Sequence, residues 1–213
     1  MVYFFTKFFK MIKIKQTYTD FIKELHIGVR AFFVELDPYG YEEKEDILAT
    51  NASAFSYVVF FSKNNDILKY DISTVCKNIQ KLNPFTHIML HVDGFKRPIG
   101  FNTLKNVEYI VHVPRPTNTI KDEEYDDDVD CNITSVMNEN AWKWLAKADA
   151  KFIFEVHSVE DFDDISIVTS GLMIKKHQIY CNIMSCEDYK EKVLYVKQYG
   201  FNVFVQLGGD WCE

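Results

Sequence analysis

Short apolar runs alternate with amphipathic segments along most of the 213-residue chain. The runs are rich in β-branched and aromatic residues, and several are almost continuously apolar, as is typical of strands covered on both faces. The pattern predicts strands at residues 31–36, 56–61, 87–92, 107–113, 151–156, 178–183 and 202–207. Strands that alternate with helices indicate βαβ units and a parallel sheet.

Helix start and stop signals lie between the predicted strands. Thr19 or Asp20 can cap a segment that Gly28 closes, and Gly200 lies where a left-handed C-cap would end the last helix. Helices are also predicted after Asp71 or Ser73, after Asn138, after the capping-box pair Ser158 and Asp161, and from Ser185 onward. Residues 37–46 contain a proline and a glycine and little apolar periodicity, which predicts a loop over the mouth of the barrel.

These elements predict an α/β fold, a partial parallel (β/α) barrel of about six to seven strands. An open doubly wound sheet is the alternative. We expect residues 1–12 to form an N-terminal extension and residues 13–213 to form a single barrel domain.

The net charge and the cysteine content exclude several classes of function. The formal net charge is −7, so no basic surface for nucleic acid is expected. Lysines interrupt the apolar N-terminus, so no membrane segment is expected either. The five cysteines form neither a disulfide framework nor a C-x-x-C pair, which indicates reduced thiols in a cytoplasmic protein. The acidic run 122–130 lacks the glycine and spacing of an EF-hand loop and is interpreted as solvated, so no metal site is predicted.

Polar residues follow most of the predicted strands. Because the carboxyl ends of parallel strands meet at one edge of a sheet, where ligands gather, these residues predict a ligand-binding rim. Its predicted members are His91, Asp93, His112, Arg115, Glu155, His157 and Gln206. Histidines beside carboxylates can also do acid–base work, although each histidine taken alone is more simply a structural side chain. No nucleophile elbow, P-loop or dinucleotide-binding glycine motif is present.

The order of segments resembles 7-carboxy-7-deazaguanine synthase, a small radical S-adenosylmethionine enzyme with an incomplete (β/α) barrel. The similar segments are IGVRAFFVEL at 27–36, MLHVDG at 89–94, VEYIVHVPRP at 107–116, KFIFEVHSVEDFDDI at 151–165 and YGFNVFVQLGG at 199–209. They span most of the chain after Met11. The resemblance implies the fold of that family.

The family's cofactor motifs are missing. Its cluster-binding C-x-x-x-C-x-x-C follows the first barrel strand, where this chain has DPYGYEEKED at 37–46. Its Gly-Gly-Glu-Pro after the next strand is replaced by SKNND at 62–66. Because thiolates bind the cluster, the sequence predicts no cofactor and a catalytically inactive relative that binds a small molecule or a protein partner, with a homodimer left open. The alternative is a cluster-independent barrel enzyme, a metal-assisted hydrolase or lyase, that uses the histidine and carboxylate rim.

Overall fold

The structure, a computed structural model, describes residues 11–22, 27–63, 67–101, 103–113, 138–183 and 188–204. It is a mixed α/β fold with a nine-stranded sheet in the order β3-β1-β2-β4-β5-β6-β7-β8-β9. The strands are β1 Met11–Ile22, β2 Ile27–Leu36, β3 Tyr41–Lys44, β4 Tyr57–Phe61, β5 His87–Val92, β6 Val107–Val113, β7 Lys151–Val156, β8 Ile179–Ile183 and β9 Asn202–Phe204. The helices are α1 Glu45–Ala52, α2 Ser73–Leu82, α4 Glu139–Lys147, α5 Asp161–Gly171 and α6 Tyr189–Tyr199, with short 3-10 turns η1 Ile67–Lys69 and η2 Lys176–Gln178.

Most of the strand pairs are parallel, which confirms the predicted α/β class. Parallel ladders join β2 to β4, β4 to β5, β6 to β7, β7 to β8 and β8 to β9. The ladder between β1 and β3 is antiparallel. All seven predicted strands are present, and β5, β6 and β7 have the predicted bounds.

The predicted helix ends are confirmed where local chemistry defines them. The Asn138 side chain accepts a hydrogen bond from the Ala141 backbone N–H at 3.2 Å and caps α4. Gly200 ends α6 with a positive φ of 74°, a conformation that favours glycine. At α2 the helix is present, and its N-cap residue is Ile72, which forms no side-chain cap.

The helix predicted after Thr19 is wrong, because residues 11–22 form strand β1. Ile12 and Ile14 are buried and Lys13 and Lys15 are exposed, a period of two residues that is typical of a strand. A capping residue is a local signal, and here the pairing of β1 within the sheet overrides it.

The predicted loop at residues 37–46 is also wrong. Only residues 37–40 form a turn, after which β3 pairs with β1 and α1 begins at Glu45. An ion pair between Lys13 and Glu42, with nitrogen and oxygen 3.1 Å apart, supports this antiparallel ladder. Helix α1 was not predicted, although Leu48, Ala49 and Ala52 form its buried face.

Two compact units divide the chain. The first comprises Met1–Phe21, Val29–Leu90 and Pro98–Val107. In it α1 packs against α2, and Phe32 of β2 stacks on Phe55 with ring centroids 5.2 Å apart. On β2, the neighbouring Phe33 stacks on Tyr18 at 5.0 Å. The unit therefore has a buried apolar core on the helical side of its strands and an aromatic cluster beside Phe33.

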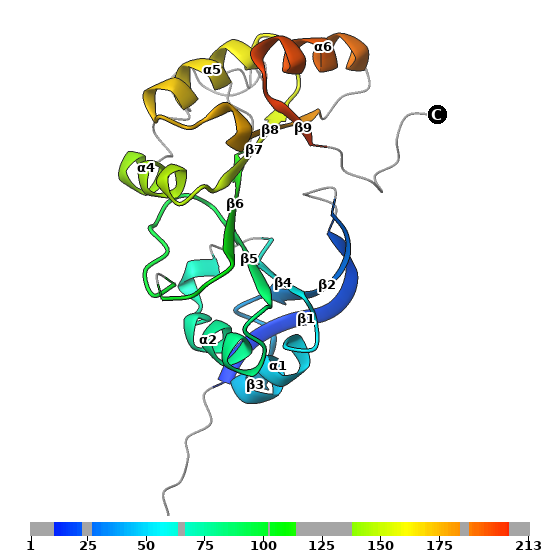
Figure 1. The fold of residues 1–213 in the computed structure, drawn as a ribbon, viewed down its shortest axis with the longest axis vertical. Helices are drawn as coiled ribbons and strands as arrows, with labels where there is room; N and C mark the ends of the chain where they lie inside the picture. Colours follow the sequence, from blue (N-terminus) through cyan, green and yellow to red (C-terminus); the bar gives the residue numbers. More distant parts are fainter. Residues whose placement is uncertain are drawn as a thin grey trace, which may run out of the picture. The chain divides into compact units, whose positions relative to one another are not determined.

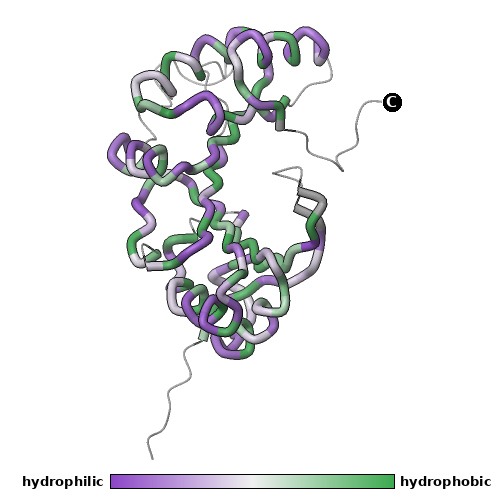
Figure 2. Tube along the Cα trace, in the orientation of Figure 1, coloured by the Kyte–Doolittle hydropathy of each residue, from purple (hydrophilic) through white to green (hydrophobic). Residues whose placement is uncertain are grey.

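The second unit comprises Ile22–Gly28, His91–Arg97 and Glu108–Glu213. Helices α4, α5 and α6 flank its strands (Figure 1), and hydrophobic and hydrophilic stretches alternate along the trace (Figure 2). Trp142 of α4 packs on Phe152 of β7 at 5.1 Å, and Phe162 of α5 stacks on Tyr195 of α6 at 5.8 Å. These aromatic contacts hold the helices on one face of the sheet.

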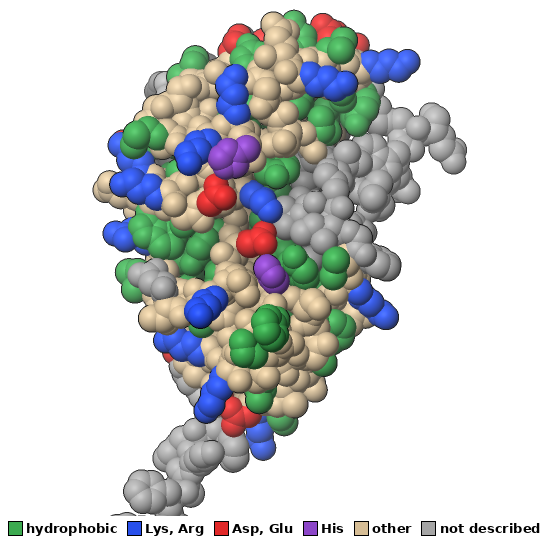
Figure 3. Space-filling view, viewed as in Figure 1, with side chains coloured by type: hydrophobic (Ala, Val, Ile, Leu, Met, Phe, Trp, Pro, Cys, Tyr) green, Lys and Arg blue, Asp and Glu red, His purple; other side chains and the backbone are tan. Residues whose placement is uncertain are grey.

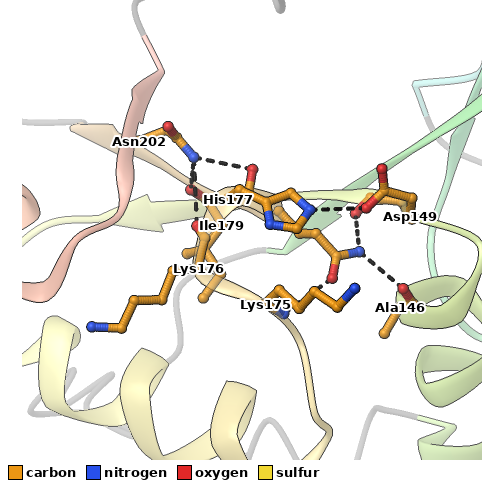
Figure 4. Close-up of polar contacts among 9 residues, drawn as sticks. Ala146, Asp149, Lys175, Lys176, His177, Ile179 and Asn202 are labelled. Carbon is orange, nitrogen blue, oxygen red and sulfur yellow. Dashed lines mark hydrogen bonds and ion pairs between the residues drawn. The ribbon is translucent and has the colours of Figure 1, made fainter.

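The buried amide of Gln178 secures the amino-terminal ends of β7 and β8. Figure 4 shows the surrounding residues, with Ala146 and Lys175 labelled. The Gln178 side chain is 1% exposed. Its Nε2 donates to the carbonyl oxygens of Ala146 and Ala150 at 3.0 and 2.9 Å, and its Oε1 accepts from the Lys175 N–H at 3.0 Å. One side chain thus joins the end of α4, the start of β7 and the turn before β8.

Candidate functional site

The sheet in the second unit has two chemically different faces. The face beneath the helices is apolar and buried; it carries Tyr109, Val111 and Val113 of β6, Phe152, Phe154 and Val156 of β7, and Ile179, Cys181 and Ile183 of β8. Along each strand, residues of this apolar face alternate with residues of the opposite face. It carries Glu108, His112, Lys151, Glu155, Tyr180 and Asn182, together with the apolar Ile110 and Ile153. We call this second side the polar sheet face.

The structure brings together two of the predicted histidines. His91 Nδ1 and His112 Nε2 are 3.0 Å apart, and the ring centroids are 4.9 Å apart. One nitrogen of this pair carries a proton and donates it to the other. His112 is exposed, whereas the Nε2 atom of the partly exposed His91 is buried. The pair therefore offers the His112 imidazole to solvent, beside a partly exposed His91 ring whose Nε2 atom is buried.

Burial lowers the pKa of His91 from 6.5 to about 4, because the protein interior disfavours a charged imidazolium. His91 is accordingly neutral at physiological pH. The neutral ring has one donor and one acceptor nitrogen, of which Nδ1 contacts His112 Nε2 and Nε2 is buried.

Lowering the pH is expected to destabilise the fold through His91. Between pH 6.5 and about 4 the unfolded chain binds a proton at this residue and the folded chain does not, so the free energy of unfolding falls with the pH. The contribution of this group is at most about 1.4 kcal/mol per pH unit and vanishes above pH 6.5. Chemical denaturation at pH 7 and pH 5 measures the difference.

The control for this experiment is another histidine. His91→Asn removes the titrating group and should flatten the pH dependence relative to the wild type. His177→Asn removes an exposed imidazole, 3.0 Å from Asp149 Oδ1, and should change the dependence little. An identical pH dependence in the wild type and His91→Asn would contradict this interpretation.

Glu155 and His157 also lie near one another at the end of β7. Glu155 Oε2 and His157 Nε2 are 4.0 Å apart, at the outer limit of an ion pair, and both side chains are more than a third exposed. The completely buried Asp161 holds the chain here, because its Oδ2 accepts from the backbone N–H groups of His157 and Ser158 at 2.8 and 2.9 Å. This is one half of the predicted capping box. It fixes the backbone that presents His157.

Asp93 has a structural role in addition to any contact with a ligand. Its Oδ1 accepts from the Phe95 N–H at 2.9 Å and closes the turn that follows β5. Gly94 has a positive φ of 77°, and a Cβ at this position would lie 2.5 Å from the indole nitrogen of the buried Trp142. The turn is therefore held against α4.

The predicted rim is thus only partly assembled. His91 with His112 and Glu155 with His157 form two pairs, and Asp93 serves a turn. Arg115 and Gln206 lie outside the described residues, as does the acidic run 122–130. Among the residues that the structure places, no His, Cys, Asp and Glu side chains form a group of three or more that could hold a metal ion.

The sequence analysis missed two ion pairs. Lys151 Nζ and Glu108 Oε2 are 3.1 Å apart on the polar sheet face of the second unit. In the first unit the buried Glu35 accepts from Lys15 Nζ at 3.0 Å and from Gln16 Nε2 at 2.6 Å. A glutamate inside an otherwise apolar strand is a signal for such a partner. The partners were missed because no strand was predicted at residues 11–22.

Residues 37–46 and the described cysteines are not suited to bind the iron–sulfur cluster of the family that the sequence resembles. Residues 37–46 hold no cysteine and form a turn, an edge strand and the start of α1. Cys76 of α2 and Cys181 of β8 are completely buried. Burial raises both thiol pKa values, that of Cys181 to about 12, whereas a cluster ligand must be a thiolate. Cys131, Cys186 and Cys212 lie outside the described residues.

Comparison with known proteins identifies the fold. No protein-family model matches the sequence, and no curated protein matches it either. The crystal structure of QueE from Escherichia coli superposes with a TM-score of 0.62 at 10% identity, covering 92% of this chain and 94% of QueE. The crystal structure of Streptococcus suis SuiB superposes with a TM-score of 0.49 at 10% identity, covering 77% of this chain and 42% of SuiB.

The described part of the chain contains no helix that is long and apolar enough to cross a membrane. The extensive superposition on QueE, a 7-carboxy-7-deazaguanine synthase, confirms the predicted partial (β/α) barrel. The chain therefore has a QueE-like fold, with no cysteine at residues 37–46, where the resemblance placed the cluster motif.

Proposed function

We propose that this protein is a catalytically inactive radical-SAM-like protein that acts by binding a small molecule or a protein partner. The observation that carries the proposal is the segment after β2, where a turn, an edge strand and a helix take the place of a cysteine-bearing loop. Without cluster ligands there, reductive cleavage of S-adenosylmethionine has no electron donor.

The polar sheet face supports the binding half of the proposal. Its side chains include the His91–His112 pair, the amide of Asn182 and the phenol of Tyr180. Its Lys151 and Glu108 charges compensate one another. Figure 3 shows acidic, basic and hydrophobic side chains interspersed on one side of the molecule. The polar sheet face suits a neutral, polar, ring-shaped ligand whose donor and acceptor edges meet imidazole and amide groups.

The alternative function, a cluster-independent hydrolase or lyase, draws on the same residues. The Glu155–His157 pair favours it, because a carboxylate near an imidazole can orient a general base. The 4.0 Å separation and the exposure of both groups favour it less than a buried, hydrogen-bonded pair would.

The cluster test uses anaerobic reconstitution with iron and sulfide, followed by desalting. We expect no stoichiometric charge-transfer absorbance, whereas Escherichia coli QueE treated in parallel provides the positive control. A full cluster that survives desalting would overturn the proposed inactivity. Its ligands would then be sought among the cysteines that lie outside the described residues.

The binding test uses guanosine as a neutral, polar, ring-shaped probe. Thermal melting and titration calorimetry should show stabilisation of the wild type that is lost in His112→Ala and retained in His177→Ala. Both substituted histidines are exposed, so neither change is expected to unfold the protein. No binding to the wild type, or equal binding to all three proteins, would remove this ligand class from the proposal.

A further inference from the structure

The two paired histidines have a geometry that also suits a metal ion. Zn²⁺ and related ions bind imidazole nitrogen at about 2.0–2.1 Å. Two nitrogens on one ion are then about 2.9 Å apart at a right angle and about 3.3 Å apart at a tetrahedral angle. The observed separation of His91 Nδ1 and His112 Nε2 is 3.0 Å, within that range.

We propose that His91 and His112 form a binding site for a first-row transition-metal ion, with Nδ1 of His91 and Nε2 of His112 as its two protein ligands. The ion takes the place of the proton that the two nitrogens share. Each ring turns by roughly 35–45°, so that the lone pairs point to a common position instead of to one another. Imidazole ligands select Cu²⁺, Ni²⁺ or Zn²⁺ over Mg²⁺ and Ca²⁺, which prefer oxygen.

Access and charge support the proposal. His112 is exposed, so an ion can reach the pair from solvent. His91 is partly exposed and its Nε2 atom is buried, which places one ligand ring in the protein and the other at the surface. Glu155 belongs to the same sheet face, and the chain carries a net charge of −7, which favours a cation.

The site is an open one. Within the ranges that the structure describes, no third His, Cys, Asp or Glu completes a ligand set with this pair. Water therefore fills the remaining positions, as in sites where a metal keeps exchangeable ligands. A two-histidine site of this kind binds more weakly than a closed structural site, and an external ligand can enter its coordination sphere.

The test is a Cu²⁺ titration of the metal-free full-length protein, followed by electron paramagnetic resonance. We expect a spectrum with nitrogen hyperfine coupling from two imidazoles. In His112→Gln this signal should disappear and calorimetric affinity at the site should fall by about tenfold or more. His177→Gln is the matched control, because it removes an exposed histidine that lies beside a carboxylate. It should bind Cu²⁺ as the wild type does.

Circular dichroism of each variant verifies the fold, and exposed His112 is not a core residue. His91→Gln provides the second variant and should give the same loss. Wild-type spectra without two-imidazole coupling, or undiminished Cu²⁺ binding by His112→Gln, would overturn the proposal and leave a hydrogen-bonded histidine pair. The outcome is independent of the cluster test, because Cu²⁺ binding requires neither iron nor sulfide.

Discussion

Replacement of Gly40 by alanine is expected to destabilise the protein by about 3 kcal/mol or more. Gly40 ends the turn between β2 and β3, where its N–H donates to the Asp37 carbonyl at 3.0 Å. A Cβ at this position would lie 2.2 Å from the Ile14 carbonyl oxygen and 2.8 Å from the Lys15 nitrogen. Both atoms belong to the backbone of β1, so relief of the clash requires the antiparallel ladder between β1 and β3 to shift.

The matched control is the same substitution at Gly171, the last residue of α5. A Cβ there meets no atom within 4 Å, and alanine is the better helix former. Gly171→Ala should therefore raise the free energy of unfolding by about 0.5 kcal/mol. Urea denaturation of the two variants measures both values. Equal stability of Gly40→Ala and the wild type would show that residue 40 lies farther from the backbone of β1 than these distances indicate.

Replacement of Gln178 by alanine is expected to lower the free energy of unfolding by about 3 kcal/mol. The buried side chain makes three hydrogen bonds to backbone groups, two of them to the carbonyl oxygens of Ala146 and Ala150 (Figure 4). Alanine leaves these groups without their side-chain partners and opens a cavity at the same place. The loss combines both effects.

Gln198→Ala is the control for this experiment, because Gln198 is an exposed residue of α6. Its removal should change the stability by less than about 0.5 kcal/mol. Thermal and urea unfolding of the two variants can be compared directly. A loss at Gln178 no larger than that at Gln198 would mean that water replaces the amide without penalty.

Different residues form the sheet core of the QueE-like fold and the segment where the resemblance placed the cluster motif. The parallel ladders from β6 to β9 and the helices beside them are formed by apolar residues, and their packing requires no cofactor. The thiolates that a cluster needs belong to a short segment outside that core, and here residues 37–46 hold none. The residues that form the sheet core and the segment where the cluster motif was expected are therefore different.

The sequence by itself determined the parallel part of the fold. β5, β6 and β7 were predicted to the residue, because each is a short apolar run rich in β-branched or aromatic side chains between polar turns. Asn138 and Gly200 marked helix ends, because capping depends on neighbouring backbone groups. The sequence also determined that the segment after β2 has no thiol.

Tertiary structure decided the rest. β1 and β3 are strands because they pair with each other over some thirty residues of sequence, an interaction that local propensity does not contain. His91 and His112 were both predicted to lie on one rim, but only strand register places their nitrogens 3.0 Å apart. Strand pairing likewise brings Glu35 of β2 to Lys15 of β1, twenty residues earlier in the sequence. Side-chain identity defines what a residue can do, and non-local pairing of the backbone selects the partner with which it does so.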